Sequence, residues 1–302
     1  LGMASLVGLL VGGLTPGRKK TMIQKIKDGS CRLLVGTHAL IQESVDMHNL
    51  GLVIIDEQHR FGVDQRKRLM AKAGHMPHVL TLTATPIPRS LALTLYGELD
   101  ISLLKQKPSG RKPVATAIVR AEQRGDMYTG LVDRVVSGEQ MYVVCPLIVK
   151  GEKGTEVLRS VEQVYAEITE KFPAGMVDLL HGKMKSDEKQ TIMQRFAAGE
   201  TKVLVATTVI EVGVDVPNAT IIVIESAERF GLAQLHQLRG RVGRSDKQSH
   251  AYLLLSNQIE PTKRLRAVAT STDGFKLAEY DLELRGAGAI YGEAQHGALD
   301  LR

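Results

Sequence analysis

The sequence predicts an α/β protein with two parallel-sheet units, and three observations carry that prediction. The chain has 302 residues, enough for two hydrophobic cores, since domains usually hold about 100–200 residues. Short β-branched runs alternate with amphipathic stretches, which is typical of a parallel sheet covered by helices. Residues 107–113 hold two prolines, one glycine and no apolar residue, so they divide this pattern in two as a linker would.

The expected strands are short apolar runs, several of them apolar throughout, as strands buried on both faces should be. They span residues 32–35, 52–56, 79–83, 115–119, 141–146, 176–180, 203–206, 220–225 and 251–255. Helices are expected between them at residues 60–72, 86–96, 126–136, 156–172 and 186–198. Pro86 and Pro88 open the second of these helices, because proline is tolerated in a first helical turn.

The strand pattern stops after residue 255, and two further helices are expected at residues 262–271 and 275–284, followed by a glycine-rich tail. We therefore expect four parts along the chain. They are a first sheet unit at residues 1–106, a linker at 107–114, a second sheet unit at 115–256, and a helical hairpin with a loop at 257–302.

Composition excludes several classes of protein. Hydrophobic residues make up 43% of the chain and charged residues 24%, which argues against disorder. Two cysteines far apart, Cys31 and Cys145, give neither a disulfide framework nor metal-ligand spacing, so we expect reduced thiols in a cytoplasmic protein. No apolar run approaches the roughly 18 residues of a membrane span, and no membrane contact is expected.

The net charge of +6 is unevenly distributed. Residues 1–105 carry 13 basic and 8 acidic side chains and residues 106–116 carry 3 and none, whereas residues 117–256 carry 17 and 18. A basic excess confined to the first third and the linker fits contact with a polyanion. An ordinary basic surface explains the charge equally well.

Two adjacent carboxylates, Asp56 and Glu57, follow the expected strand at 52–56. They stand at its carboxyl end, where open α/β sheets bind ligands. Successive residues point different ways, so one carboxylate can hold hydrated magnesium while the next faces an attacking water. Phosphoryl transfer needs both roles. Taken alone, a solvated strand end explains the pair better.

Further polar groups follow other strands. Thr83 and Thr85 offer two hydroxyls within reach of His59, linking the carboxylates to a neighbouring loop. In the second unit, Arg241 and Arg244 are three apart on a glycine-bearing turn, where guanidinium groups can reach a transferring phosphate. A basic surface turn is the alternative interpretation of these arginines.

Small hydroxylated residues after two strands suit close approach to a phosphate backbone. Thr207 and Thr208 follow the strand at 203–206, and Gly36 and Thr37 follow the strand at 32–35. Asp215, a few residues beyond, is placed to reach a ribose hydroxyl or an arginine.

Four motifs together resemble superfamily-two helicases in order and approximate spacing. They are Asp-Glu-Gln-His at 56–59, Thr-Ala-Thr-Pro-Ile-Pro-Arg at 83–89, Val-Ile-Glu-Val-Gly-Val-Asp-Val-Pro at 209–217 and Gln-Leu-Arg-Gly-Arg-Val-Gly-Arg at 237–244. The extended contexts at 56–63 and 232–241 more closely resemble the RecG family of ATP-dependent DNA helicases, which remodel branched DNA. The resemblance covers nearly the whole chain and implies two RecA-like lobes, the first incomplete at its N-terminus.

The resemblance implies a role for each matching residue. Asp56 would coordinate Mg²⁺, Glu57 would activate the hydrolytic water, and Arg241 and Arg244 would be arginine fingers towards ATP. Residues that would bind nucleotide or couple it to lobe motion are Gln58, His59, Thr83, Thr85, Asp215 and Gln237. Residues that would track DNA phosphates are Gly36, Thr37, Thr207 and Thr208.

The C-terminal part resembles the translocation hairpin of RecG and of the transcription-repair coupling factor. Arg264, Arg285 and Gln295 are spaced like its polar residues, although Ala294 stands where RecG relatives often carry a basic residue. Gln58, in place of glutamate, and the Ser-Gly-Arg sequence of the linker favour RecG. The implied partners are forks and four-way junctions of double-stranded DNA and single-strand-binding protein, with the protein acting as a monomer in recombination and repair.

No P-loop of the form G-x-x-x-x-G-K-[ST] occurs in the sequence. The nearest string, residues 12–19, has Arg18 in place of the lysine and Pro16 in place of a backbone donor, so we reject it. We therefore expect the chain to begin partway through the first lobe, without the wedge domain, and to hydrolyse ATP poorly by itself. Two alternatives stay open: the motor of a coupling factor, and a nucleic-acid-binding module without ATP hydrolysis.

Overall fold

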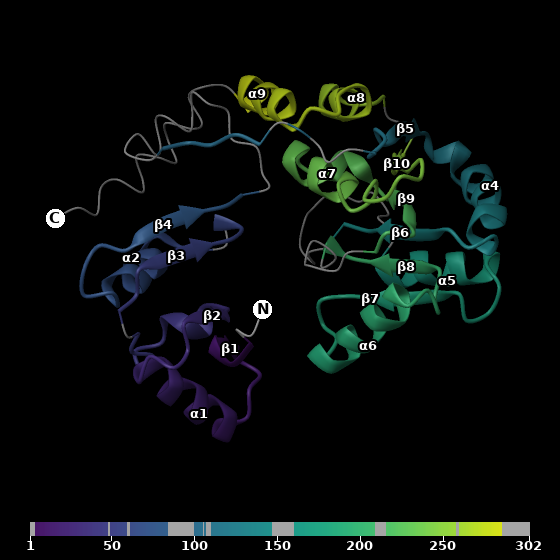
Figure 1. Cartoon of the computed structure of the whole chain (residues 1–302). Coiled ribbons are helices and arrows are strands. Elements are labelled where there is room, and N and C mark those ends of the chain that lie inside the picture. Colours follow the sequence, from purple (N-terminus) through teal and green to yellow (C-terminus); the bar gives the residue numbers. More distant parts are fainter. Residues whose placement is uncertain are drawn as a thin grey trace. The chain divides into compact units, whose positions relative to one another are not determined.

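A computed structural model gives the structure of the protein, shown in Figure 1. It describes residues 4–47, 49–58, 61–83, 100–104, 106, 110–146, 160–208, 216–257 and 260–285. The chain divides into two compact units, residues 1–84 and residues 85–302. Each unit is considered by itself below.

The first unit holds two small parallel sheets. Its elements are η1 (Ala4–Leu6), β1 (Val7–Leu10), α1 (Pro16–Lys27), β2 (Leu33–Gly36), η2 (His38–Ile41), β3 (Leu52–Ile55), α2 (Val63–Ala71) and β4 (His78–Thr81). Strand β1 pairs with β2, and β3 pairs with β4, both in parallel. Leu40 and Met47 pack against the cores beneath both sheets, so the two sheets belong to one unit.

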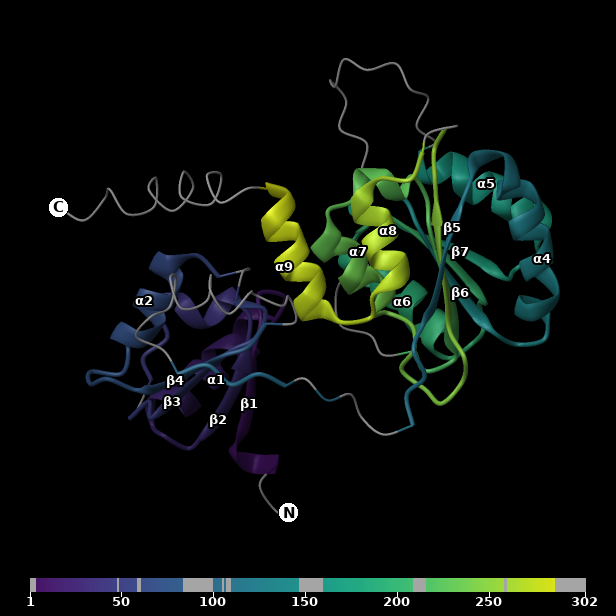
Figure 2. The same ribbon diagram turned by 90° about the horizontal axis from the view of Figure 1, so that it is seen from above.

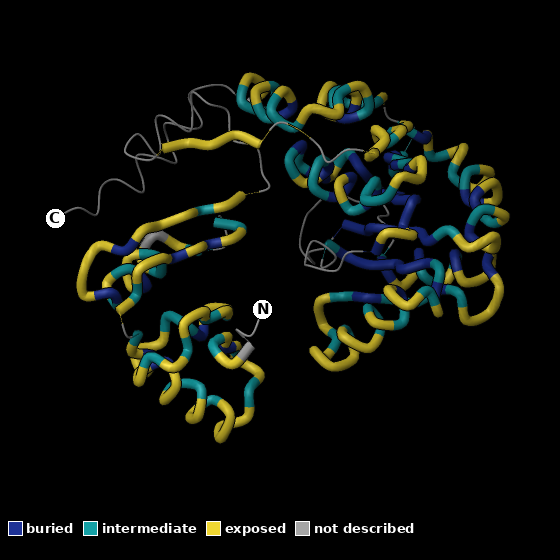
Figure 3. Tube along the Cα trace, in the orientation of Figure 1, coloured by how far each residue is buried: buried dark blue, intermediate teal, exposed yellow. Residues whose placement is uncertain are grey.

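One face of the first unit's strands is apolar and exposed. Val7, Leu9, Leu33 and Val35 alternate along β1 and β2 with 47–57% of their surfaces exposed, and Leu52 and Ile54 do the same on β3. Figure 3 shows β4 largely in the exposed colour and β3 alternating between exposed and buried, unlike the dark strands β6, β8 and β9 of the second unit. Parallel sheets are normally covered on both faces, whereas the described residues of the first unit leave this face uncovered.

The second unit is built on a six-stranded parallel sheet in the order β5-β10-β9-β6-β8-β7. Its strands are β5 (Ala115–Val119), β6 (Gln140–Val144), β7 (Val177–Leu180), β8 (Val203–Ala206), β9 (Ala219–Ile224) and β10 (His250–Leu254). Its helices are η4 (Ala121–Gln123), α4 (Arg124–Val136), α5 (Val161–Lys171), α6 (Ser186–Ala197), η6 (Ala227–Arg229), α7 (Leu232–Arg239), α8 (Lys263–Thr270) and α9 (Gly274–Arg285).

Helices cover both faces of this sheet, as Figure 2 shows. On one face, Tyr128 of α4 and Ile168 of α5 pack against alternate residues of β6, β8 and β9. On the other face, Phe196 of α6 and Leu235 of α7 pack against the intervening residues of the same strands. Every residue of β6, β8 and β9 is buried, and all are apolar apart from Gln140, Tyr142 and Thr220.

The C-terminal helices α8 and α9 form a hairpin that packs on the same face as α7. Leu265 and Val268 of α8 and Leu277 of α9 are buried in the same core as Leu238 of α7. Thr262 caps the start of α8, because its hydroxyl accepts a hydrogen bond from the Leu265 backbone N–H. The expected hairpin after residue 257 is therefore present through residue 285.

The predicted fold class is confirmed: each described unit contains parallel strands covered by helices. Among the described elements, β1, α1 and α7 were missed, as were the short 3-10 helices η1, η2, η4 and η6. Strand β1 was missed because its short apolar run is broken by Gly8 and followed by Gly12 and Gly13. The helix expected at residues 60–72 is shorter at both ends in the described chain, because Gly62 with an extended backbone is its N-cap. The helix expected at 86–96 lies outside the described residues, and the linker boundaries at 107 and 114 stay predictions.

Within the described residues, no helix is long and apolar enough to cross a membrane. Both cysteines are free thiols, and burial raises the pKa of the Cys145 thiol far above its usual range. Free thiols at Cys31 and Cys145 agree with the expectation of reduced cysteines.

We predict that neighbouring leucines of β1 differ sharply in their effect on stability. Leu10→Ala should lower the free energy of unfolding of the first unit by about 2–5 kcal/mol, because Leu10 is fully buried. Leu9→Ala should cost less than about 1 kcal/mol in this chain, since its side chain is half exposed. Urea unfolding of the two variants measures both values. Equal losses of unfolding free energy in the two variants would contradict the conclusion that the face carrying Leu9 is uncovered.

Candidate functional site

The first unit gathers polar groups at the carboxyl ends of β3 and β4. The parallel register places Ile55 opposite Thr81, so the residues that follow each strand emerge side by side. The Leu82 N–H donates to the Ile55 carbonyl at 2.8 Å, and the Gln58 N–H donates to the Leu82 carbonyl at 3.1 Å. Asp56, Glu57, Gln58 and Thr83 thus share one sheet edge, here called the carboxylate edge. The sequence predicted that Thr83 lies near the carboxylates, whereas the predicted contact of Thr83 and Thr85 with His59 falls outside the described residues.

Glu57 adopts an unusual backbone conformation at this edge. Its φ is +48°, in the left-handed region that a non-glycine residue rarely occupies. Its N–H donates to Asp56 Oδ1 at 2.8 Å, which holds the turn directly after the strand. The turn lets the two neighbouring carboxylates point in different directions: Asp56 is exposed and Glu57 is half-buried.

The chemistry of Asp56 fits a magnesium ligand. Mg²⁺ prefers oxygen ligands and usually binds through one or two carboxylates together with phosphate oxygens and waters. An exposed carboxylate at a strand end meets that requirement with room for the phosphates.

Gly36 and Thr37 follow β2 in the same unit. A Cβ on Gly36 would collide with the Leu10 carbonyl oxygen and lie 2.9 Å from the Leu40 side chain, so the close packing of β1 and β2 requires glycine there. Thr37 is exposed and its carbonyl accepts from the Leu40 N–H at 3.0 Å. Gly36 therefore shapes the turn that presents Thr37 to solvent.

The second unit carries the two predicted finger arginines on a turn that leaves α7. This arginine turn, residues 241–244, is anchored by Val242, which is buried in the core. The Arg241 N–H donates to the Leu238 carbonyl at 2.9 Å, and Arg244 Nε donates to the Gly240 carbonyl at 3.2 Å. Arg241 and Arg244 are half-buried on either side of Gly243. The backbone of the turn is thus fixed to the unit's core.

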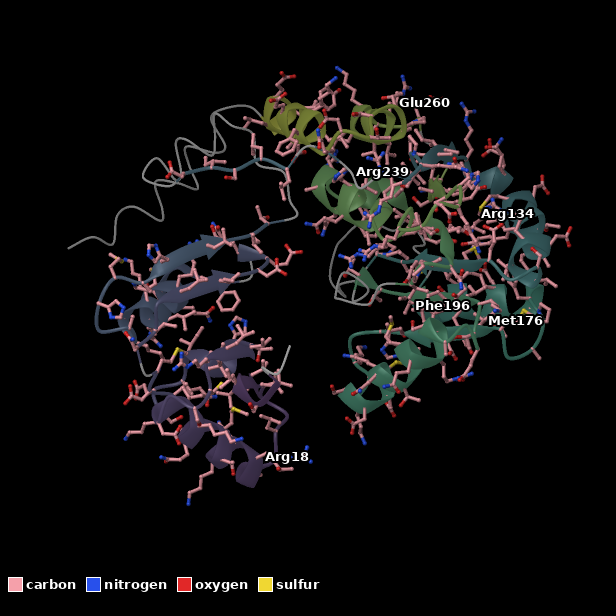
Figure 4. All side chains as sticks on the ribbon, viewed as in Figure 1. Arg18, Arg134, Met176, Phe196, Arg239 and Glu260 are labelled. Carbon is pink, nitrogen blue, oxygen red and sulfur yellow. The ribbon has the colours of Figure 1, made fainter. Side chains whose placement is uncertain are left out.

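Arg239, two residues before the turn, was not among the predicted site residues. Its side chain is buried, and Nη1 donates to the carbonyls of Val268, at 2.5 Å, and Ser271, at 2.8 Å. These carbonyls stand at the C-terminal end of α8, where helix carbonyls lack partners and favour a positive charge. Figure 4 labels Arg239 on α7. Arg239 therefore ties α7 directly to the helical hairpin.

Thr207 and Thr208 stand at the carboxyl end of β8, as predicted. Thr207 is buried, and its hydroxyl oxygen has no hydrogen-bond partner among the described residues. Its N–H donates to the Leu180 carbonyl, which extends the pairing of β8 with β7. A buried hydroxyl without a partner at the ligand-binding edge of a sheet is a candidate ligand contact.

A buried ionic cluster lies at the end of β9 in the same unit. Glu225 accepts from Tyr128 Oη at 2.7 Å and forms an ion pair with Arg124 Nη2 at 2.8 Å. Arg124 also pairs with Glu167 at 2.7 Å. Loss of solvent, and then the neighbouring Glu225, raise the pKa of the Tyr128 hydroxyl well above its usual value, so Tyr128 stays a donor. The cluster joins α4, α5 and β9.

Other predicted site residues are less fully placed. Gln237 is half-buried on α7, and Arg264 is exposed on α8. Arg285 ends α9, and its side chain is not described. His59, Thr85, Asp215 and Gln295 lie outside the described residues.

The Glu225 cluster should contribute strongly to the stability of the second unit. Glu225→Ala should lower its free energy of unfolding by about 3–5 kcal/mol, because it removes the buried carboxylate that pairs with Arg124 and accepts from Tyr128, while the ion pair of Arg124 with Glu167 remains. Glu260→Ala is the matched control, since its ion pair with Arg120 is exposed and should cost less than about 1 kcal/mol. Urea unfolding followed by circular dichroism compares them. Similar losses would argue against the cluster's structural role.

The comparisons with known proteins agree with this arrangement. Residues 3–94 match the DEAD/DEAH box helicase family, and residues 128–246 match the helicase conserved C-terminal domain. The chain is similar to the ATP-dependent DNA helicase RecG of Aquifex aeolicus, with 50% identity over 98% of this chain and 38% of the relative. With RecG of Staphylococcus aureus it shares 48% identity over 97% of this chain and 43% of the relative.

A solved structure of RecG bound to a three-way DNA junction superimposes with a TM-score of 0.74 and 43% identity. The match covers 94% of this chain and 37% of that protein. The chain thus spans about two fifths of the length of these relatives.

Proposed function

Because this chain belongs to the RecG family of superfamily-two DNA helicases over the stretch that it spans, we propose that it forms most of the ATP-driven motor of a DNA translocase. The observation that carries the proposal is that each of the two units, taken by itself, presents a set of polar groups suited to phosphate chemistry. One unit presents adjacent carboxylates on a left-handed turn, and the other presents two arginines on a turn anchored in its core. A module that binds nucleic acid without hydrolysing ATP does not need both the adjacent carboxylates and the two arginines.

The proposed roles follow the chemistry of each group. Asp56 holds Mg²⁺, which neutralises phosphate charge when bound, and Glu57 accepts a proton from the attacking water. Arg241 and Arg244 stabilise the charge on the transferring phosphate. The residues that contact nucleotide or couple its state to movement are Gln58, His59, Thr83, Thr85, Asp215 and Gln237.

We propose that residues outside this sequence supply the phosphate cradle, since no P-loop occurs in it. The uncovered apolar face of β1, β2 and β3 supports the same view, because a further part of the first lobe would bury it. We propose that the intact protein hydrolyses ATP, whereas this chain alone does so poorly or not at all.

The proposed DNA contacts grip the backbone, so binding has little sequence specificity and weakens with salt. They comprise Gly36, Thr37, Thr207, Thr208, Arg264, Arg285 and Gln295. Lobe closure around ATP would shift these contacts along duplex DNA, and Arg239 would carry the motion of α7 to the hairpin.

The proposed substrates are branched double-stranded DNAs, stalled forks and four-way junctions, in recombination and repair. The RecG structure that superimposes on this chain is bound to a three-way DNA junction, which supports this choice. The proposal extends to a cytoplasmic monomer that works with single-strand-binding protein. The relatives at 48–50% identity are named RecG, which supports the RecG interpretation over the coupling-factor alternative.

Glu57→Gln tests the proposed general base in a longer protein that joins this chain to its P-loop segment. ATP hydrolysis with branched DNA should fall by about 10²–10⁴-fold while ATP binding persists, because the amide cannot accept the proton. Glu43→Gln is the control, since Glu43 is an exposed acid of the same unit. Unchanged turnover in Glu57→Gln would remove this residue from the role.

Thr207→Val tests the proposed DNA contact at β8. It should lower DNA-stimulated hydrolysis and DNA affinity without loss of stability, because the hydroxyl removed has no partner within the described chain. Thr201→Val removes an equally buried, equally unpartnered described hydroxyl at the opposite end of β8, and should leave DNA affinity unchanged. Equal affinities for the two variants would refute a ligand role for Thr207.

A further inference from the structure

The arginine turn lies directly against the last residues of the predicted linker. These residues, 112–114, lead into β5, which pairs in parallel with β10. The Ala115 N–H donates to the Ser249 carbonyl at 2.9 Å, and Gln248 Nε2 donates to the Pro113 carbonyl at 2.9 Å. The linker end is therefore fastened to the residues that directly precede β10.

Gly243 makes the contact from the side of the arginine turn. Its φ is +75°, and a Cβ built on it would lie 2.7 Å from Val114 Cγ2. Real Cβ atoms do not approach so closely, so the turn and the linker end can meet only where this position has no side chain. Gly243 is flanked by Val242 and Arg244, with Arg241 one residue further back.

Ser249 joins the two segments with one buried residue. It is 1% exposed, its hydroxyl accepts from the Gly243 N–H at 3.1 Å, and its carbonyl accepts from the Ala115 N–H. Ser249 thus holds the backbone of the arginine turn at a fixed distance from the start of β5.

We propose that Val114, Gly243 and Ser249 form a positioning node that sets the arginine turn relative to the linker. The inference rests on the proposed function, in which Arg241 and Arg244 reach a nucleotide whose other contacts lie in the first lobe. The linker is the covalent pivot between the lobes in that function. Because the arginine turn is fastened to the linker, its guanidinium groups keep a fixed position relative to the linker as the lobes close.

None of the three residues needs to touch the nucleotide, so they are positioning residues. A displaced arginine turn loses stabilisation of the transition state more than binding of ATP, because displacements of about 1 Å can cost about 10²-fold in rate. The expected signature is a fall in kcat with little change in KM.

The test uses Gly243→Ala in the longer protein with its P-loop segment, with ATP turnover measured in the presence of branched DNA. Gly175→Ala is the matched control, because Gly175 has a φ of +82° and nothing within 4 Å of its Cβ position. Both variants carry the same backbone strain, and only Gly243→Ala meets Val114. We expect kcat to fall at least about tenfold in Gly243→Ala and by less than about twofold in Gly175→Ala.

A double-mutant cycle also truncates Val114, the side chain that opposes Gly243. In Val114→Ala/Gly243→Ala the collision with Cγ2 is gone, so kcat should return towards that of Val114→Ala alone. Ser249→Ala serves as an independent variant should Gly243→Ala fold poorly, because it removes the acceptor of the Gly243 N–H without adding atoms, and it should also lower kcat with KM retained.

Equal kcat values for Gly243→Ala and Gly175→Ala would overturn the node, as would a double variant with no recovery of kcat. An unchanged kcat in Ser249→Ala would also overturn the node. No DNA-stimulated turnover by the unmodified longer protein would overturn the proposed function, and the node with it, so the two failures are distinguishable.

Discussion

Burial of both faces of the six-stranded parallel sheet is the constraint on which the second unit depends. Strands β6, β8 and β9 contribute no exposed residue, and helices of the same unit cover each face. Polar chemistry can therefore stand only at the strand ends. Thr207 and Glu225 lie at the carboxyl ends of β8 and β9, and the arginine turn is held by Val242 in one of the two cores.

The same constraint explains what the first unit lacks. Strands β1, β2 and β3 carry no polar side chain on either face, as in a sheet covered on both faces, yet Leu9 and Leu33 remain more than half exposed. The carboxylate edge is nevertheless formed, because the pairing of β3 with β4 and the left-handed turn at Glu57 are local. Two strands are thus enough to position the carboxylates. In the proposed function, a complete phosphate-binding site requires further parts of the first lobe.

Local signals made much of this predictable from the sequence. Strands β5 and β8 have the expected bounds, because each is a short apolar or β-branched run with clear breaks. The carboxylate edge was predictable because Asp56 and Glu57 directly follow such a run. Helix α1 was missed because its basic residues indicated contact with a polyanion more strongly than a buried face, and only Ile26 in it is buried.

Groups that meet only through tertiary structure could not be predicted. Arg124 and Glu225 are 101 residues apart, and nothing near either one in the sequence marks a buried pair. Arg239 was not predicted as a site residue, because only the tertiary structure buries it against the end of α8, where its partner Val268 is 29 residues away in the sequence. Val114 and Gly243 likewise come together only because β5 pairs with β10.

The measurement that tests the central claim most directly is ATP turnover, with and without branched DNA, by this chain and by a version extended to include a P-loop segment. The account predicts that only the extended protein turns over ATP and that branched DNA stimulates it, because the carboxylates and arginines are in this chain and the phosphate cradle is not. Robust DNA-stimulated turnover by this chain alone would contradict the account, as would a folded extended protein that stays inactive with every DNA structure offered.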